Sequence, residues 1–424
     1  MDMPQHIAET IVDPLAYADF DRIHDVLTEL RRTAPVARAN LEGFEPFWVI
    51  SKFDDVRHVE RDNTLFRAGD KATVLTPKAV DAITRENTGG SPHIFRTMVH
   101  MDEPDHGSYR ALTQEWFSAK SVPQLEEKIR ELARTAVDEM AELGGECDFA
   151  SQVALYYPLR VIMSLLGVPP EDEPLMLKLT QQIFGAPDAD MNVDGRSDMT
   201  PEEQQAAIMA VAAEVFGYFN AMTQDRRKNP RDDLASIISN SRINGEPLGE
   251  NEALSYYVIL ATAGHDTTSN SVSAGMWALC EHPEIFAAVQ QDPDLIPGLV
   301  EESIRWEAPV KHFMRTATAD TEIRGVPIAR DDWMMLSFAS ACRDEEHYEN
   351  PFSFDVRRSP NRHLALGFGA HVCLGQHLAR LEMRILWEEL LSRLESVEAA
   401  GPIRRVAAGF VSGPKSLPIR FRFK

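Results

Sequence analysis

Hydrophobic residues recur every three or four positions in several long stretches, which is the spacing of one face of an α-helix. The stretch over 250–281 is unusually long: at ~30 residues and 1.5 Å per residue it would reach ~45 Å, enough to cross the whole molecule. The stretch over 125–143 ends at Gly144 and Gly145, as a helix often does. The pattern predicts helices over 125–143, 250–281, 293–306 and 374–395.

Strand-like runs of β-branched and aromatic residues are short and few. They cover 47–50, 334–338 and 419–423. Stretches rich in Gly, Asp, Asn and Thr are expected to form loops over 68–100 and 185–203. Because we find no internal repeat, low-complexity tract or long linker, we expect one domain over 1–424, mainly α with a small β region.

Composition and charge argue against a nucleic-acid-binding, membrane-spanning or secreted protein. The 424 residues are 44% hydrophobic and 26% charged, and 43 Lys and Arg against 66 Asp and Glu give a net charge of −23. Such a charge disfavours a broad nucleic-acid surface. No apolar run approaches the ~20 residues of a membrane span, and no secretory signal is visible. The four cysteines are far apart and form no CxxC pair, which predicts a reducing, cytoplasmic compartment.

The candidate chemistry centres on Cys373, which follows a glycine-rich segment and precedes a predicted helix. At a helix N-terminus, unpaired N–H groups and the positive end of the dipole stabilise a thiolate. Gly367 and Gly369 let the backbone approach a flat ligand closely. A thiolate held in this way can be the axial ligand of a haem, where it favours O–O cleavage.

Two other interpretations of Cys373 compete with haem ligation. A lone cysteine is most often a buried structural residue. A zinc site built from His371, Cys373 and His377 lacks the paired Cys/His spacing of a closed tetrahedral site. The zinc interpretation is therefore rejected.

The segment 366–375 resembles the haem-binding loop of the cytochrome P450 family, usually Phe-Gly-x-Gly-x-His-x-Cys-x-Gly. It departs from that form at Leu366, where the family has Phe. Further family motifs occur in the family's order, so the resemblance covers about 15–420. It implies the triangular, mainly α haem-thiolate fold, with haem b (iron protoporphyrin IX) ligated by Cys373 and contacted by Leu366 and Gly367.

A second motif, Ala-Gly-His-Asp-Thr-Thr, occupies 263–268 within the long predicted helix. On its own, a polar cluster in an apolar helix is typical of a solvent-facing stripe. The resemblance places it above the haem instead. Gly264 then allows a local widening of the helix beside the cofactor, Thr267 hydrogen-bonds bound O2 or its water, and Asp266 gates proton delivery.

A third motif pairs Glu302 with Arg305. Taken alone, an i,i+3 pair of this kind is usually a surface ion pair of little energetic weight. It resembles the ExxR pair of the family, which a second arginine joins, here Arg358. The resemblance makes this network structural, beneath the haem, and not catalytic.

Four cationic residues form the last constellation. His106 and Arg110 share a helical face at i,i+4 spacing, and Arg315 and His363 lie ten residues from motif residues. Each alone is typical of a surface charge. The resemblance assigns all four to the two haem carboxylates, which charge-assisted donors neutralise well in a poorly solvated site.

The implied reaction is hydroxylation of a C–H bond by a monooxygenase that uses O2. No GxGxxG loop or flavin module is present, so the NAD(P)H-dependent reductase is expected to be a separate chain. The resemblance implies that a [2Fe-2S] ferredoxin brings the electrons. An acidic ferredoxin would dock on a basic face, for which the candidates are Arg110, His371, His377 and Arg380. The alternatives are a peroxide-driven haem-thiolate oxygenase and a non-catalytic haem or small-molecule binding protein. Asp266 and Thr267 argue against both.

Several runs resemble the terpineol-hydroxylating branch of the bacterial enzymes, which implies a monoterpenoid or small alkylaromatic substrate. These runs are 145–149, 156–159, 173–180, 308–311 and 360–364. By position, the candidate walls of an apolar pocket are Ile94, Phe95, Met98, Phe184, Leu260, Ala263, Val310, Phe313, Phe410 and Val411. Ordinary core packing is the competing interpretation for most of them.

Overall fold

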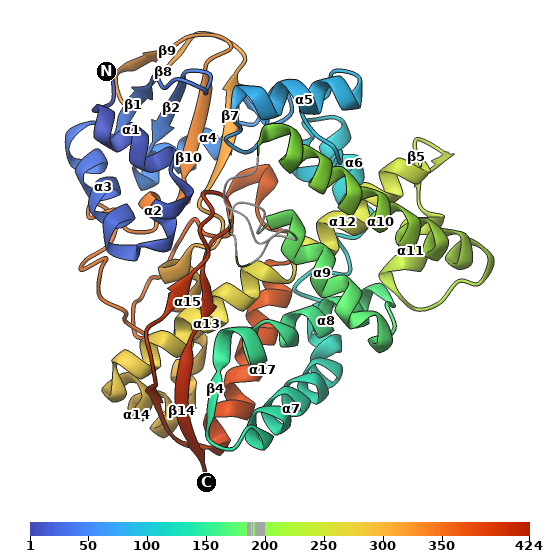
Figure 1. The fold of residues 1–424 in the computed structure, drawn as a ribbon, viewed down its shortest axis with the longest axis vertical. Coiled ribbons are helices and arrows are strands. Elements are labelled where there is room, and N and C mark those ends of the chain that lie inside the picture. The colour runs from blue at the N-terminus through green and yellow to red at the C-terminus, as the bar shows by residue number, and fades with distance from the viewer. Residues whose placement is uncertain (185–187, 189, 191–199) are drawn as a thin grey trace.

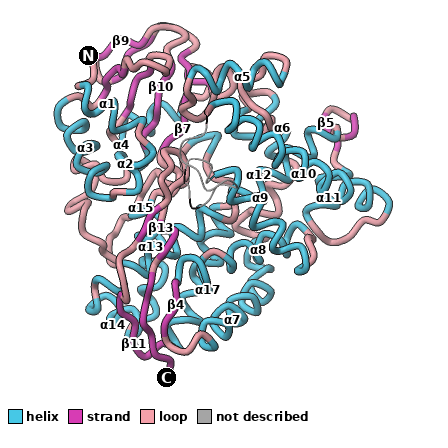
Figure 2. Tube along the Cα trace, viewed as in Figure 1, coloured by secondary structure: helices cyan, strands magenta, loops and turns pink. Residues whose placement is uncertain are grey.

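The computed structural model describes residues 1–424 except 185–187, 189 and 191–199. Helices form most of the described chain, and most strands lie in two groups, one near the N-terminus and one that runs toward the C-terminus (Figures 1 and 2). The C-terminus lies at the opposite end of the molecule, beside β14 (Figure 1). The expected mainly α architecture with a small β region is confirmed.

The helices of the first half begin near the N-terminal sheet and continue around the molecule. They are α1 (Gln5–Val12), α2 (Pro14–Ala18), α3 (Phe20–Thr33), α4 (Phe53–Arg61), α5 (Lys78–Thr88), α6 (Asp105–Ala111), α7 (Glu126–Glu142), α8 (Tyr156–Leu166) and α9 (Glu173–Phe184). Those of the second half are α10 (Pro201–Lys228), α11 (Leu234–Asn240), α12 (Glu250–Ala263), α13 (Asp266–Glu281), α14 (Pro283–Gln291), α15 (Ile296–Glu307), α16 (Phe338–Ala341) and α17 (Gln376–Arg393).

The principal sheet has five strands. Their spatial order is β1 (Val36–Ala39), β2 (Phe47–Ile50), β10 (Trp333–Ser337), β7 (His312–Ala317) and β3 (Phe66–Arg67). Only β2 and β10 run parallel, and both are buried along their whole length. The sheet therefore joins the N-terminal segment to strands that follow α15, and it places Arg315 of β7 opposite Met334 of β10.

The smaller sheets complete the β region. They are β11 (Leu394–Ala399), β14 (Pro418–Phe423) and β4 (Glu146–Asp148) in one sheet, β12 (Arg404–Arg405) with β13 (Pro414–Ser416), β5 (Arg242–Ile243) with β6 (Glu246–Pro247), and β8 (Thr321–Ile323) with β9 (Val326–Ile328). The strands predicted from sequence correspond to β2, β10 and β14, and those predictions are confirmed. So are the helices that became α7, α15 and α17.

The helical prediction over 250–281 is confirmed at both ends, but the expectation of one continuous helix was wrong. α12 ends at Ala263 and α13 begins at Asp266. The Gly264 and His265 N–H groups lie 3.3 and 3.4 Å from the carbonyls of Leu260 and Thr262, so the helical ladder is weakened there. The Thr267 hydroxyl donates to the Ala263 carbonyl at 2.8 Å and occupies an acceptor left by the break.

The loop predictions were also partly wrong. Helix α5 lies within 68–100 and ends at Gly89, whose φ of +69° suits glycine. Most of 185–203 lies outside the described residues, but its end forms the start of α10. There Thr200 and Glu203 make a capping box and Pro201 occupies the first turn, signals that were readable in the sequence.

Helix α13 runs through the interior of the molecule. Most of its side chains are buried, and it packs against α15 on one side and near α17 and β11 on others. Polar residues such as Ser273 and Asn270 are buried on it, which an ordinary core helix avoids. Among the helices of the described residues, none is long and apolar enough to cross a membrane.

Candidate functional site

The loop that carries Cys373 is fixed by backbone bonds and by contact with α4. The Cys373 N–H donates to the Leu366 carbonyl at 2.8 Å, and Gly367 and Gly369 have φ values of +71° and +68°. A Cβ at Gly369 would lie 2.4 Å from the Glu60 carbonyl oxygen. Glycine is therefore required there by both conformation and space.

Cys373 lies just before α17, with its sulfur within reach of several positive groups. Burial raises the pKa of the Cys373 thiol, while the Gly375 N–H, Arg110 and Arg380 act in the opposite direction. All four cysteines of the chain are free. Cys373 is the one that lies on a glycine loop at a helix N-terminus, the environment that suits a thiolate ligand.

Three of the predicted cationic residues gather beside this loop, and a fourth joins them. The rings of His106 and His371 have centroids 4.2 Å apart. Burial lowers the pKa of His371, and the nearby charges of Arg315 and Arg110 lower it further. Arg315 is buried on β7 and its Nη1 donates to the Met314 carbonyl at 2.9 Å. The cluster thus draws on α6, β7 and the cysteine loop.

The cluster fits the two carboxylates of a haem. In the described part of the chain, Arg110 has no carboxylate within ion-pair distance, and the one closest to Arg315 is Glu60 at 3.9 Å. Two incompletely neutralised arginines beside a thiol and a glycine-lined loop match the needs of a flat, dianionic, iron-bearing group.

The fourth expected residue, His363, has a buried Nδ1 with no hydrogen-bond partner among the described residues, and its place at the haem carboxylates stays a prediction. Its Nε2 lies 3.2 Å from Glu301 Oε2, and Arg380 contacts the same carboxylate at 2.5 Å. Burial alone would raise the pKa of Glu301, but bonds from His363 and Arg380 lower it to about 2. His371, which the sequence analysis placed on a docking face, takes the position beside His106.

Three of the four residues expected on a basic docking face have other neighbours in the structure. His371 and Arg110 belong to the cluster beside Cys373, and Arg380 is paired with Glu301. His377 and Arg380, with Arg384 and Glu301, line a hollow of about 290 Å³ between α15, α17 and the segment before α7. The charges at this hollow are therefore mixed and not a simple basic patch.

Asp266 and Thr267 are the first two residues of α13, directly after the helix break. Burial raises the pKa of Asp266, although His265, whose Nδ1 lies 3.6 Å from Asp266 Oδ1, lowers it. Oδ2 of Asp266 is buried with no hydrogen-bond partner among the described residues. Ala263, one turn before Thr267, is exposed although Thr262 before it is buried, so this face of the helix borders open space.

A polar cavity of about 280 Å³ adjoins Asp266. Its lining includes Ser151, Asn270, Arg404 and Lys415 together with Asp266 itself. Such a lining holds water well, because each water needs two to four polar partners. The carboxyl therefore has one side toward a polar cavity and another toward the helix break.

Gly264 lies where the helix passes close to α8. A Cβ at this position would lie 3.2 Å from the Leu260 carbonyl and 3.3 Å from Ile162 Cδ1. Its φ of −84° is ordinary, so close approach and not backbone strain explains the glycine. The expected widening takes the form of a break between two helices.

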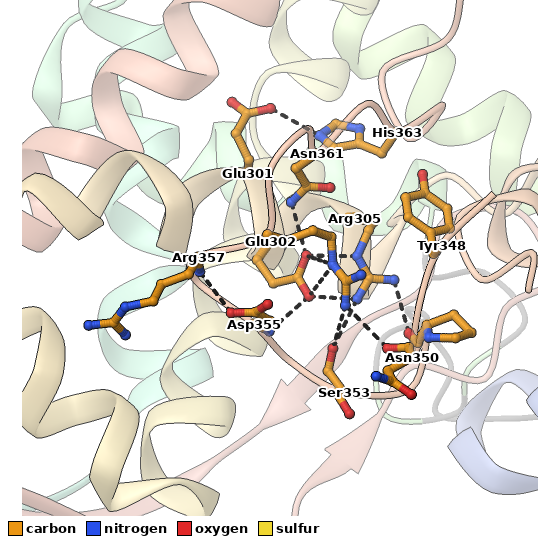
Figure 3. A network of polar contacts seen from close by, with 12 residues as sticks. Glu301, Glu302, Arg305, Tyr348, Asn350, Ser353, Asp355, Arg357, Asn361 and His363 are labelled. Carbon is orange, nitrogen blue, oxygen red and sulfur yellow. Dashed lines mark hydrogen bonds and ion pairs between the residues drawn. The ribbon is translucent and has the colours of Figure 1, made fainter.

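Glu302, Arg305 and Arg358 form one buried network. Figure 3 shows Glu302 and Arg305 together at its centre, with Asn361 beside them. Arg305 makes two bonds of 2.7 Å to the Glu302 carboxylate, and Arg358 Nε lies 3.3 Å from each oxygen. Asn361 and the Asp355 N–H also donate to it at 2.9 and 3.0 Å. Arg305 further donates to backbone carbonyls of the 342–353 segment, so the network ties α15 to the chain leading to the cysteine loop.

The candidate pocket residues divide into groups. Val310 and Val411 form a β-bridge, and the rings of Phe313 and Phe410 lie 5.4 Å apart. Phe95, Met98 and Leu260 pack in or against the main hydrophobic core. Ile94 is half-buried, and the side chain of Phe184 lies outside the described residues.

Sequence reasoning missed two buried carboxyl groups near the site. Glu60 lies at the end of α4 and Glu382 in α17, each 3% exposed or less. Both occupy positions where the helical pattern calls for an apolar residue, next to Val59 and Leu381. That mismatch was the available signal.

Comparisons with known proteins agree with this geometry. The cytochrome P450 family model matches residues 14–417. The chain is 47% identical to a Pseudomonas protein named cytochrome P450-terp, over 99% of this chain and 98% of that protein. It is 33% identical to a steroid C26-monooxygenase of Rhodococcus jostii, over 97% of this chain and 84% of the relative.

Solved structures share the whole fold. The crystal structure of CYP108D1 from Novosphingobium aromaticivorans matches with a TM-score of 0.92 and 44% identity, covering 100% of both chains. A Mycobacterium marinum cytochrome P450, CYP268A2, in complex with pseudoionone matches with a TM-score of 0.87 and 29% identity, covering 98% of this chain and 97% of that one. The chain belongs to the cytochrome P450 family and is a haem-iron monooxygenase that uses O2 and redox partners.

Proposed function

We propose that this monooxygenase hydroxylates a small apolar substrate, a monoterpenoid or an alkylaromatic. The observation that carries the proposal is the helix break, where the exposed Ala263 and the half-buried Thr267 border open space and Asp266 is buried beside them. Support for the substrate class comes from the 47% identity to a protein named for a terpene and from the apolar group around Phe313 and Phe410. Ala263, Leu260, Val310 and Val411 complete the proposed wall.

The cofactor of the proposal is haem b: Cys373 would bind its iron, and His106, Arg110, Arg315 and His363, with His371 beside them, would hold its carboxylates. When bound, the haem supplies the oxygen-activating chemistry. Thr267 holds a hydroxyl at the helix break, and Asp266 passes a proton from the polar cavity toward that hydroxyl. Leu366 and Gly367 hold the cysteine loop, and the Glu302 network stabilises the chain beneath it.

Electrons come, in this proposal, from a [2Fe-2S] ferredoxin reduced by a separate NAD(P)H-dependent reductase. One domain over 1–424 carries the whole site, and the free cysteines fit a reducing cytoplasm. A salt-dependent reduction rate would support electrostatic docking near His377 and Arg380. A rate that does not change with salt would contradict it.

The test is a screen of terpenes and alkylbenzenes against the haem-loaded protein. We expect a subset to shift the Soret band from low to high spin and to yield hydroxylated product with NADH, a ferredoxin and its reductase. Turnover with peroxide alone, and none with the ferredoxin system, would favour a peroxide-driven oxygenase. Haem binding without turnover in either system would favour a binding protein.

A further inference from the structure

Glu60 is a buried acid in a place where the fold offers it little compensation. It lies in the last turn of α4, on the side that carries Phe53, Val56 and Val59 into the core. Its side chain faces the cysteine loop and not water, since the residue is 3% exposed. Carboxylates are rarely buried to this degree without a close partner.

Two groups contact the Glu60 carboxyl. The Phe368 N–H, in the cysteine loop, donates to it. Arg315 Nη2 lies 3.9 Å from Oε1, too far for a direct hydrogen bond. Oε2 is buried and has no hydrogen-bond partner among the described residues. The carboxyl therefore links β7 to the cysteine loop, yet half of it is unsatisfied.

Glu60 lies against the loop that carries Cys373, so its charge would act close to the cofactor. A Cβ at Gly367 would be in van der Waals contact with Oε1 at 3.6 Å, and a Cβ at Gly369 would collide with the Glu60 carbonyl. Arg315 is also one of the cations proposed for the haem carboxylates. A charge on Glu60 would compete with those carboxylates for Arg315 in a poorly solvated site.

We propose that Glu60 is a positioning residue for the haem site: it holds the Phe368 amide beside Arg315, and its charge state sets the reduction potential of the haem. This inference rests on the proposed function, because it requires a haem at the Arg315 cluster. Burial raises the pKa of Glu60 to about 8, although Arg315 and the Phe368 N–H lower it. Glu60 is then a neutral acid at pH 7 and an anion in mildly alkaline solution.

The charges that face Glu60 agree with this assignment. From β7 it meets Arg315, and behind Arg315 lie Asp102, before α6, and His371 of the cysteine loop. Asp102 is held by the N–H groups of Ala68 and Gly69, each at 2.8 Å. Loss of the Glu60 proton therefore adds an anion to a region already shared by Asp102 and the haem carboxylates. That added negative charge favours the ferric state.

The test compares Glu60→Gln with wild type by redox titration of the haem-loaded protein. We expect the wild-type potential to fall as pH rises between about 6 and 9. Glu60→Gln keeps an acceptor for the Phe368 N–H but carries no charge, so its potential should stay higher at alkaline pH and match wild type at acid pH. Asp55→Asn, on the same helix but paired with Arg324, is the matched control and should follow wild type.

A second arm measures how firmly the haem is held. Transfer of haem to apomyoglobin should be several-fold faster from Glu60→Leu, which loses the bond from Phe368, and within about two-fold of wild type from Glu60→Gln. A Glu60→Gln potential that follows wild type across the whole pH range would overturn the inference alone. A wild-type protein that retains no haem would instead contradict the proposed function, and this inference with it.

Discussion

The Thr268 hydroxyl donates to the carboxyl of Glu382 and so joins α13 to α17 one residue beyond Thr267. The Tyr157 hydroxyl donates to the Glu382 carbonyl at 2.9 Å, which adds α8 to the same junction. Oε2 of Glu382 is buried without a hydrogen-bond partner among the described residues. The two helices that enclose the site are thus connected through an acid, not only through apolar packing.

The first prediction concerns the proton of Glu382. Burial raises the pKa of Glu382 well above its usual value, with only Thr268 opposing the shift. The folded state therefore binds a proton that the unfolded chain releases, and stability falls as pH rises above the ordinary range of a glutamate. We expect Glu382→Gln to unfold at higher urea concentration than wild type at about pH 9 but to match it near pH 4. Equal midpoints at both pH values would show that Glu382 is not held neutral.

The second prediction concerns oxygen activation. Thr267→Ala removes the hydroxyl at the helix break and, with it, the organised path from Asp266. Substrate binding should persist, while product per NADH falls several-fold and the missing electrons appear as peroxide. Thr262→Ala is the control, because Thr262 bonds the Val258 carbonyl at 2.7 Å one turn before the break. Unchanged coupling in Thr267→Ala would assign the proton to Thr268 or to ordered water.

The sequence predicted elements and motifs better than it predicted partners. Helix spacing located α7, α15 and α17, and the glycine pattern located the loop of Cys373. It could not show that His363 pairs with Glu301, because that contact joins residues 62 positions apart. From its place in the cysteine motif, His371 was expected on a docking surface, but its ring packs against that of His106 inside the cluster.

The helix break was also beyond the pattern. Residues 264–271 include no hydrophobic side chain, and the resemblance implied a local widening at Gly264, but the apolar spacing on either side favours one continuous helix. Only the competition of the Thr267 hydroxyl for the Ala263 carbonyl, together with Gly264 against Ile162, decides where the ladder opens. Side-chain bonds to backbone of this kind depend on tertiary contacts that the sequence does not display.

The third prediction concerns the buried network. Glu302→Ala leaves Arg305 and Arg358 without their shared carboxylate, and the loss of one partner of a buried pair costs about 3–5 kcal/mol. We expect a matching fall in the free energy of unfolding and faster loss of haem. Glu395→Ala is the control, because its pair with Arg422 is exposed and contributes about 0–1 kcal/mol. A cost for Glu302→Ala no larger than the control's would show that the network is not structural.

The fourth prediction identifies the haem ligand. The reduced wild-type protein should give a strongly red-shifted CO complex, the signature of thiolate ligation, and Cys373→Ser should lose it. Cys280→Ser tests a half-buried cysteine away from the loop and should keep the band. A wild-type CO band at the position typical of histidine or neutral thiol ligation would contradict thiolate ligation by Cys373.

The last prediction concerns Leu366, where the chain departs from the family's Phe. Its carbonyl accepts the Cys373 N–H at 2.8 Å, a bond that any residue can make, while its half-buried side chain packs against the main core. Leu366→Phe should therefore keep haem binding, because an apolar replacement of somewhat larger size needs only modest repacking. It should still shift the reduction potential, since the polarity and access of solvent at the sulfur depend on that side chain. Redox titration of the two proteins under one set of conditions measures the shift. Identical potentials would mean that Leu366 only fills space beside the loop.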